Sequence, residues 1–242
     1  SHRNLLDTAN RRTTFVFALT FLLLATGIIT SGFIYLRGYE RTYRAEIDSQ
    51  LSTIADMKKE MLANWREDYL KDAAVLFKNT YFHALVRRYL ENPEDANAER
   101  QLQSWISVYP DGYHFDQVRL IDTHGVTRMS VPAGRPPTSL AIREDITEVL
   151  RSGQVKLKDF YFCEDCQKIH LAVLIPILDE TDGDRPLGIL DLRIDPTTIL
   201  YSLISQWPTL SRTAEILILR REGNDVLFLN ELRFQKNTAL KL

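Results

Sequence analysis

An uncharged run near the beginning of the chain, residues 13–36, most constrains what this sequence can fold into. Clusters such as Phe15–Phe17 and Leu22–Leu24 make the run apolar on every helical face, unlike the one-sided pattern of a helix at the surface of a globular domain. A helix needs about 20 consecutive apolar residues to cross the hydrocarbon core of a bilayer. The run therefore predicts a transmembrane helix, preceded by a short leader over residues 1–12.

Two other kinds of segment are alternatives to this anchor. A buried core helix is usually shorter and is not apolar on every face. A cleaved signal peptide has a shorter apolar region and a small-residue cleavage site, and the stretch TSGFIYLRG does not provide one. The direction of the helix stays open under the positive-inside rule, because arginines stand on both sides: Arg3, Arg11 and Arg12 before it, and Arg37, Arg41 and Arg44 after it.

The composition and the motifs exclude several classes of function. A formal net charge of −2 over 242 residues argues against a nucleic-acid-binding protein, which normally has a concentrated basic surface. Two cysteines are too few for a disulfide-built scaffold. Nucleotide-binding, serine-hydrolase and zinc-protease motifs are all absent from the sequence. We therefore expect no catalytic residue and no cofactor in this chain.

A long amphipathic stretch follows the anchor. No glycine or proline interrupts it between Tyr39 and Leu90. Its larger apolar residues recur at steps of three, four or seven, which is the period of a helix: Tyr43, Ile47, Leu51, Ile54, Met61, Trp65 and Tyr69. The pattern predicts one long helix that bends near Asn79 and stops at Asn92-Pro93, and then a short helix over Ala98–Val108 that ends at Pro110-Asp111-Gly112. Residues 37–110 are thus expected to be helical.

The period of the pattern changes to two after residue 111, which is typical of strands. The expected elements, in chain order, are a hairpin (Phe115–Asp122 and Val126–Val131), a helix from Thr138 or Ser139 to Gly153, three strands (Val155–Phe162, Ile169–Leu178 and Leu187–Ile194), and a helix capped by Asp195 that runs to Gln206. This order predicts an α+β, PAS-like domain over residues 111–207. We expect a five-stranded antiparallel sheet with helices packed on one face and a pocket on the other.

A second strand–turn–strand pattern occurs about a hundred residues after the first. The segment AEILILRREGNDVLFLN has the same pattern of two apolar strands joined by a polar, glycine-containing turn as DQVRLIDTHGVTRMSV. An isolated hairpin is marginally stable in water. We therefore interpret residues 208–242 as the opening hairpin of a second module of the same kind, and the sequence as a piece of a longer protein.

Several of these segments resemble the double Cache (dCache) sensor family. They are the long helix after the anchor, the strands DQVRLID, KIHLAVLIPIL and RPLGILDLRIDP, and above all the junction YSLISQWPTLSRTAEILILRREGNDVLFLNEL. The junction looks like the link between the membrane-distal and membrane-proximal modules in bacterial sensor histidine kinases. The resemblance implies a cytoplasmic leader, an anchor in the inner membrane and a periplasmic or extracellular sensor that binds a small molecule. Chemoreceptors and diguanylate cyclases use the same sensor, so the histidine kinase is only the favoured parent.

Five polar residues on the predicted strands are candidates for ligand binding: Arg119, Asp159, His170, Asp191 and Arg193. An arginine binds a carboxylate with two parallel hydrogen bonds, and an aspartate binds an amine. The alternative interpretation is a set of surface ion pairs, each of which contributes little to stability. The arginine-x-tryptophan-tyrosine motif of amino-acid-binding dCache members is not present, so the sequence does not predict an amino-acid ligand.

The two cysteines form the sharpest local pattern, Cys163-Glu-Asp-Cys166, at the tip of a predicted hairpin. The pair is a candidate disulfide, a redox switch or, with His170, part of a metal site. A structural zinc site normally has four protein ligands and only three are local, so we favour the disulfide or a thiol pair and predict no metal. Four aromatic residues are interpreted as packing residues: Trp65, Tyr69, Trp105 and Trp207.

The sequence thus predicts the ligand-sensing region of a transmembrane receptor. A small solute, such as a carboxylate or another metabolite, binds the PAS-like domain, and the long helix transmits a displacement across the membrane within a homodimer. The alternative is a membrane-tethered structural or protein-interaction module without a small-molecule ligand. An exposed apolar patch in place of a pocket favours that alternative.

Overall fold

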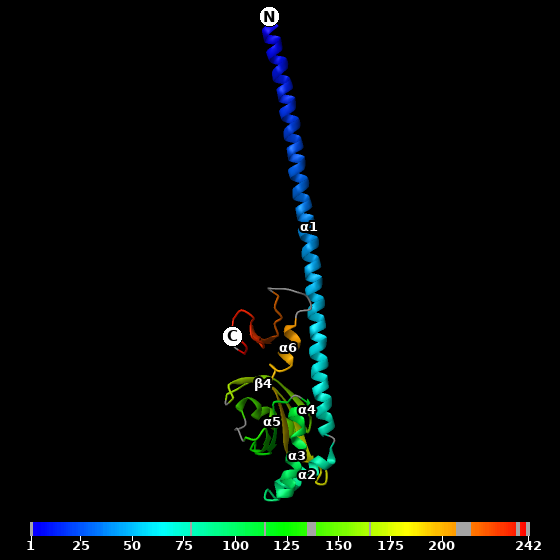
Figure 1. Ribbon diagram of the computed structural model, residues 1–242, viewed down its shortest axis with the longest axis vertical. Coiled ribbons are helices and arrows are strands. Elements are labelled where there is room, and N and C mark those ends of the chain that lie inside the picture. The colour runs from blue at the N-terminus through cyan, green and yellow to red at the C-terminus, as the bar shows by residue number, and fades with distance from the viewer. Residues whose placement is uncertain are drawn as a thin grey trace. The chain divides into compact units, whose positions relative to one another are not determined.

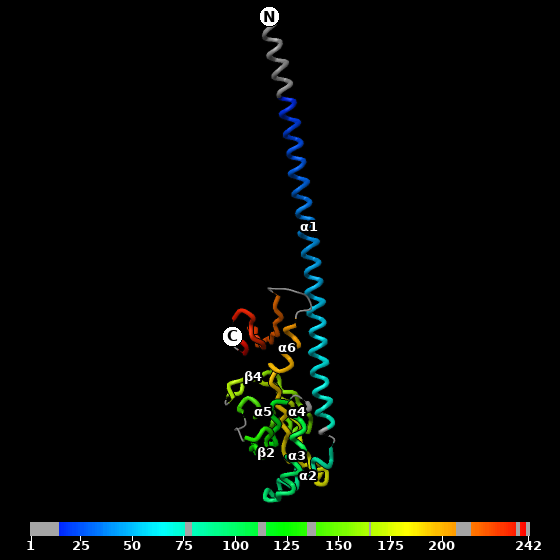
Figure 2. Tube along the Cα trace, in the orientation of Figure 1, coloured from blue at the N-terminus to red at the C-terminus, as the bar shows by residue number. Residues whose placement is uncertain are grey.

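The structure is a computed structural model that describes residues 2–77, 79–113, 115–134, 139–164, 166–206, 214–235 and 238–240; the side chains of residues 2–14, 76, 77 and 111–113 are not described. The chain divides into two compact units, Ser1–Lys59 and Glu60–Leu242. The order of the elements can be followed in Figures 1 and 2.

Helix α1 (His2–Phe77) makes up the first unit and continues into the second. From Phe15 its apolar side chains are exposed, and by length and composition it can cross a membrane. This agrees with the predicted anchor. Within the second unit, Trp65, Tyr69 and Ala73 on the same helix pack in the hydrophobic core, as predicted for the two aromatic residues.

The helical region does not bend near Asn79 as predicted, because α1 ends at Phe77 and a new helix begins. Asn79 is the N-cap of α2 (Thr80–Glu91), and its side-chain oxygen accepts a hydrogen bond from the Phe82 backbone N–H at 2.9 Å. A side-chain oxygen at the N-cap satisfies one of the unpaired N–H groups at a helix start, so asparagine favours a new start here over a continuous helix.

The next two helices also differ from the prediction. Helix α3 (Ala96–Ile106) is capped by Asp95, and a short helix α4 (Val108–Tyr113) includes Pro110, where we expected a turn. A proline is tolerated in the first turn of a helix because the N–H groups there have no intrahelical partner. The Pro-Asp-Gly pattern was therefore a wrong stop signal.

The predicted five-stranded antiparallel sheet is confirmed, in the order β2-β1-β5-β4-β3. Its strands are β1 (Gln117–Asp122), β2 (Thr127–Val131), β3 (Lys156–Cys163), β4 (Lys168–Asp179) and β5 (Arg185–Ile194). Gly188 on β5 lies so close to β1 that an added Cβ would overlap the Ile121 carbonyl oxygen. Glycine here permits the close approach of the two backbones.

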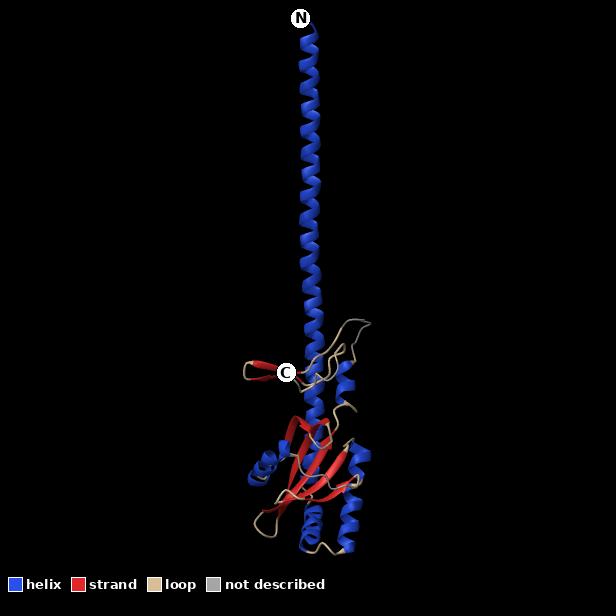
Figure 3. Ribbon diagram, turned by 90° about the vertical axis from the view of Figure 1, so that its left-hand side faces the viewer, coloured by secondary structure: helices blue, strands red, loops and turns tan. Residues whose placement is uncertain are grey.

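Helices cover both faces of the sheet, whereas we predicted helices on one face only (Figure 3). The end of α1, α2 and α3 share one core with residues such as Leu120, Val173 and Leu192. Helix α5 (Leu140–Ser152) packs on the opposite face, against Ile121, Leu174 and Ile189 among others. As predicted, Ser139 caps α5 and Gly153 ends it with a φ of 64°. Thr138, the alternative start, lies outside the described residues.

The last elements follow the sheet. Asp195 does not cap a helix; its carboxylate accepts hydrogen bonds from the backbone and hydroxyl of Thr197, which gives a turn before α6 (Leu200–Ser205). Strands β6 (Leu219–Glu222) and β7 (Asp225–Phe228) form the second hairpin, as predicted. Its membership of a second module stays a prediction. Trp207 lies outside the described residues.

Candidate functional site

A group of polar side chains replaces the aliphatic pattern on part of the α5 face of the sheet. Strand alternation brings Gln117 and Arg119 of β1 to the same face as Asp191 and Arg193 of β5, because Arg119 stands opposite Asp191 and Gln117 opposite Arg193. His170 of β4, another of the five candidates, also lies on this face, because it stands two residues before Ala172, which packs with α5. We call the following residues the polar cluster: Asp116, Gln117, Arg119, Tyr161, His170, Asp191 and Arg193.

A buried ion pair forms the centre of the polar cluster. Arg119 and Asp191 are 3% and 0% exposed, and the Arg119 Nε–H donates to Asp191 Oδ2 at 2.8 Å. The Arg119 Nη2 group donates to the same oxygen. Burial opposes the charge on the guanidinium, but the Asp191 carboxylate outweighs it and raises the pKa of Arg119 above its usual value. The guanidinium of Arg119 therefore keeps its charge in the folded protein.

A second pair joins β5 to the residue before β1. The Arg193 Nε–H and Nη2 groups donate to Asp116 Oδ2 at 3.0 and 2.9 Å. The same oxygen lies 3.8 Å from Nδ1 of His170, whose side chain is 1% exposed. Burial and then the charge of Arg193 lower the pKa of His170 to about 4, so that its imidazole is neutral at neutral pH. Burial raises the pKa of Asp116, against the opposing effect of Arg193.

Three buried oxygen atoms of the polar cluster have no hydrogen-bond donor among the described residues. They are Oδ1 of Asp116, Oε1 of Gln117 and Oδ1 of Asp191. A buried acceptor without a partner costs about 1–3 kcal/mol, and such atoms are rare in folded proteins. Nδ1 of His170, 3.8 Å from Asp116 Oδ2, has no hydrogen-bond partner among the described residues either. Apart from this ring nitrogen, the unpaired side-chain atoms of the polar cluster are acceptors.

Asp159 was predicted to join this group, and the structure places it elsewhere. Its side chain is 58% exposed, and its Oδ2 accepts a hydrogen bond from Nη1 of Arg220 on β6 at 3.0 Å. The pairing of β3 with β4 shifts register between Lys158 and Tyr161. A bulge of this kind breaks the alternation of side chains, so that Asp159 does not share the position of Tyr161.

The structure joins Cys163 and Cys166 in a disulfide at the turn between β3 and β4. The Sγ atom of Cys166 lies 3.3 Å from Nε2 of His170 and 3.9 Å from Nη1 of Arg193. The disulfide therefore borders the polar cluster.

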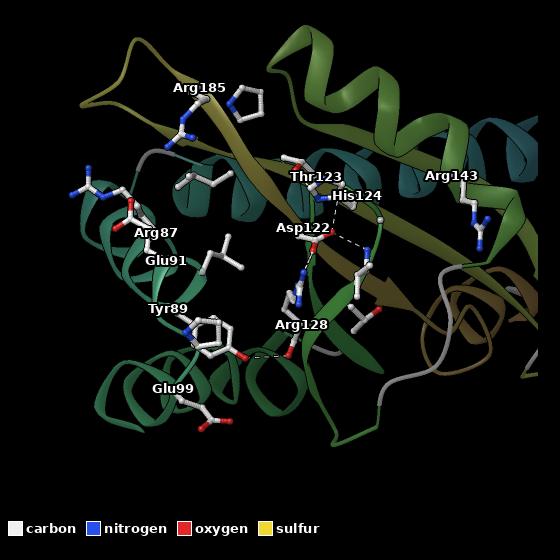
Figure 4. Close-up of a pocket in the computed structure, with 17 residues that line it drawn as sticks. Arg87, Tyr89, Glu91, Glu99, Asp122, Thr123, His124, Arg128, Arg143 and Arg185 are labelled. Atoms are coloured by element: carbon white, nitrogen blue, oxygen red, sulfur yellow. Dashed lines mark hydrogen bonds and ion pairs between the residues drawn. The ribbon is translucent and has the colours of Figure 1, made fainter. Parts of the chain in front are cut away.

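A cleft of about 800 Å³ lies near the opposite ends of β1 and β5 (Figure 4). Its polar lining includes Arg87 of α2, the β1–β2 turn, Arg128 of β2 and Arg185 of β5. Oδ2 of Asp122 lies 2.6 Å from Nη2 of Arg128. The carboxylate of Asp179, beside the cleft, lies 3.1 Å from Nη1 of Arg87 and 3.5 Å from Nη2 of Arg185. These three arginines are already paired, so they give no sign of a missing ligand.

Three members of the polar cluster were not predicted: Asp116, Gln117 and Tyr161. The signal for Gln117 was present, because it stands two residues before Arg119 on a predicted strand and therefore shares its face. The signal for Tyr161 was its register opposite His170, which requires the pairing of the strands. Asp116 lies one residue before β1 begins, so the alternation of side chains along the strand does not predict where it points.

Comparison with known proteins identifies the fold. No protein-family model and no curated protein matches the chain. Among solved structures, the sensor domain of the histidine kinase DctB of V. cholerae matches with a TM-score of 0.54 and 13% identity, over 69% of this chain and 61% of that domain. The ligand-binding domain of the Pseudomonas fluorescens chemoreceptor CtaA, solved with L-serine, matches with a TM-score of 0.54 and 14% identity, over 82% and 77%.

The chain spans less than two thirds of the DctB sensor domain, and at these identities the likeness concerns the fold alone. The chain therefore has the fold of these two domains, a histidine-kinase sensor domain and a chemoreceptor ligand-binding domain, which is the kind of sensor region expected from the sequence.

Proposed function

We propose that this chain is the ligand-sensing region of a transmembrane receptor and that a small solute binds at the polar cluster. The observation that carries the proposal is the set of three buried acceptor oxygens, on Asp116, Gln117 and Asp191, for which the described part of the chain provides no donor. Unpaired buried acceptors lower the stability of a folded domain, whereas a bound molecule with hydrogen-bond donors satisfies them.

The missing donors define the class of ligand. Two of the three oxygens belong to carboxylates, and each carboxylate has its other oxygen bonded to an arginine. A protonated amine supplies up to three N–H donors and one positive charge to such a set. We therefore propose a small metabolite with a protonated amine. The L-serine bound by the chemoreceptor CtaA, which carries such a group, supports this class.

Arg119 and Arg193 were first interpreted as groups that bind a ligand's carboxylate. In the structure each of them already binds an aspartate of the chain itself. We propose that their role at the site is to hold the carboxylates in place, so that Asp116 and Asp191 each present one oxygen. A carboxylate on the ligand is then not required for binding.

The route of the signal is also a proposal. The solute binds outside the cytoplasmic membrane, the leader lies inside, and the anchor spans a bacterial inner membrane. Exposed apolar side chains on α1 support a homodimer formed along this helix, because an apolar stripe at helical spacing favours pairing with a second helix. The stripe includes Tyr39, Tyr43, Ile47 and Leu51. The parent protein is proposed to be a sensor histidine kinase.

The test is binding of candidate solutes to the whole chain in lipid nanodiscs. A panel of amines, amino acids and carboxylates is screened by thermal shift, and hits are measured by calorimetry. We expect at least one amine-bearing compound to stabilise the chain and carboxylates without an amine to have no effect. If no compound in a broad panel shifts the unfolding temperature, the proposal fails and the protein-interaction module gains support.

A variant pair makes the assignment specific. Gln117→Leu removes one unpaired oxygen without breaking an ion pair, and it should weaken binding of the hit about 10-fold to 100-fold, which is typical of a lost hydrogen bond to a charged group. The matched control is Gln103→Leu on the exposed face of α3, which should bind as the wild type does. Equal loss or equal retention in both variants contradicts a site at the polar cluster.

A further inference from the structure

Three metal-binding side chains meet at the turn between β3 and β4, and the proposed solute site does not require the two cysteines. The Sγ atoms of Cys163 and Cys166 and a ring nitrogen of His170 all lie within 4.8 Å of one another. The spacing along the chain, two residues between the cysteines and three before the histidine, is short enough for one turn to present all three groups. In the structure the two sulfur atoms are bonded to each other.

The backbone of the turn already supports a sulfur ligand. The Cys166 backbone N–H donates to Sγ of Cys163 at 3.3 Å. A hydrogen bond from a backbone N–H stabilises the charged form of an acceptor, and the thiolate is the form of cysteine that binds metal. The turn therefore already directs a backbone donor at the sulfur atom of Cys163.

The surroundings also support the other two ligands. The Arg193 guanidinium lies 3.9 Å from Sγ of Cys166, so it can donate to a thiolate there. Asp116 binds Arg193 and lies 3.8 Å from Nδ1 of His170, the ring nitrogen opposite the one that faces the sulfur. A carboxylate behind a histidine is the usual outer partner that orients a metal ligand.

We propose that the reduced form of this turn binds one soft divalent cation such as Zn²⁺ through Cys163, Cys166 and His170. A dithiol reductant opens the disulfide, giving two thiols and becoming a disulfide itself. Binding of Zn²⁺ then releases the two thiol protons and forms two zinc–sulfur bonds and one zinc–nitrogen bond. The turn is thus closed by a disulfide when oxidised and by a metal when reduced.

The distances allow this exchange with small movements. Zinc–sulfur bonds of about 2.3 Å and zinc–nitrogen bonds of about 2.0 Å in a tetrahedral site place the ligand atoms roughly 3.5–4 Å apart. Opening the disulfide lets the sulfur atoms separate to that distance, and the ring nitrogen is 3.3 Å from Cys166 Sγ. Three protein ligands leave the fourth position open to water or another ligand, as in catalytic zinc sites.

The experiment is a metal titration of the whole chain in detergent, with and without prior reduction by a phosphine. Zn²⁺ binding is measured by competition with a chromophoric chelator, and Co²⁺ is used as a spectroscopic probe because thiolate ligands give it charge-transfer absorption. We expect one equivalent of Zn²⁺ to bind the reduced chain at least 100-fold more tightly than the oxidised chain. Equal affinity for both forms overturns the proposal.

Variants identify the ligands. Cys163→Ser and Cys166→Ser should each lower the affinity of the reduced chain at least 100-fold, and Asp116→Asn should lower it about 10-fold to 100-fold as an outer partner. The matched control is His124→Ala at the cleft, which should leave zinc binding unchanged. Unchanged affinity in the cysteine variants, or an equal loss in the control, refutes the site. Zinc binding does not depend on the solute proposal, because Gln117→Leu tests the solute without touching a metal ligand.

Discussion

Removal of one partner from the Arg119–Asp191 pair should destabilise the second unit strongly. The two side chains are 3% and 0% exposed, so Asp191→Ala leaves a guanidinium buried without a counter-ion. Loss of one partner from a buried pair costs about 3–5 kcal/mol. In a domain of this size each kcal/mol lowers the unfolding temperature by about 2–4 °C, so we expect a decrease of roughly 6–20 °C.

The double variant separates the cost of an orphaned charge from the value of the pair. Replacement of a buried ion pair by apolar residues of similar volume is often neutral or stabilising. Arg119→Met combined with Asp191→Leu should therefore recover most of the stability that Asp191→Ala loses. The recovery requires both substitutions, since Arg119→Met alone leaves the carboxylate uncompensated.

The assay is urea unfolding of the whole chain in detergent, followed by the fluorescence of the core residues Trp65 and Trp105. The control is Arg220→Met, which breaks the solvent-accessible pairs with Asp159 and Glu222 and should cost no more than about 1 kcal/mol. If Asp191→Ala costs as little as the control, the pair is not buried in solution and the central feature of the polar cluster is wrong.

Three further predictions concern single positions. Gly188→Ala should lower stability by about 1–3 kcal/mol, seen as a lower urea midpoint, because its methyl group would overlap the Ile121 carbonyl. Ser139→Ala should cost about 1 kcal/mol in the same assay through loss of the α5 cap, and Ser139→Asp should retain most of it. The pKa of His170, lowered to about 4 by burial and Arg193, lies below that of an unfolded histidine, so the unfolded chain binds more protons between pH 6.5 and 4. Stability should therefore fall by on the order of 3 kcal/mol as pH decreases through this range, and His170→Gln should flatten that part of the stability–pH curve.

The strands and the capped helix α5 were predictable because their signals are local. Alternation with period two marks β1, β2, β4 and β5, and the Ser139 cap and Gly153 mark both ends of α5. The predicted helix boundaries were wrong where the same residue type is common both at helix ends and in turns. Asn79 caps a new helix where we expected a bend, Pro110 stands inside a helix start, and Asp195 closes a turn.

The candidate site was predictable only in part, because its members come together through pairing between strands. Arg119, His170, Asp191 and Arg193 were selected from their positions on strands, and the structure brings these four together. Asp159 was misplaced because a bulge is not visible in an alternating pattern. Which oxygen atoms lack a donor depends on the register of β1 against β5, and no local signal contains that information.

The cost of the polar cluster is itself an argument for a function. Ile121, Leu174 and Ile189 show that the same face of the sheet accepts aliphatic side chains where α5 covers it. Elsewhere on this face the chain has two ion pairs and three oxygens that find no donor among the described residues, although an apolar set of similar volume is often as stable or more stable. Buried core positions normally carry apolar side chains. Charged residues at such positions that add no stability are expected at functional sites. We therefore expect the double variant Arg119→Met, Asp191→Leu to recover most of the stability that Asp191→Ala loses and, for the same reason, to lose solute binding.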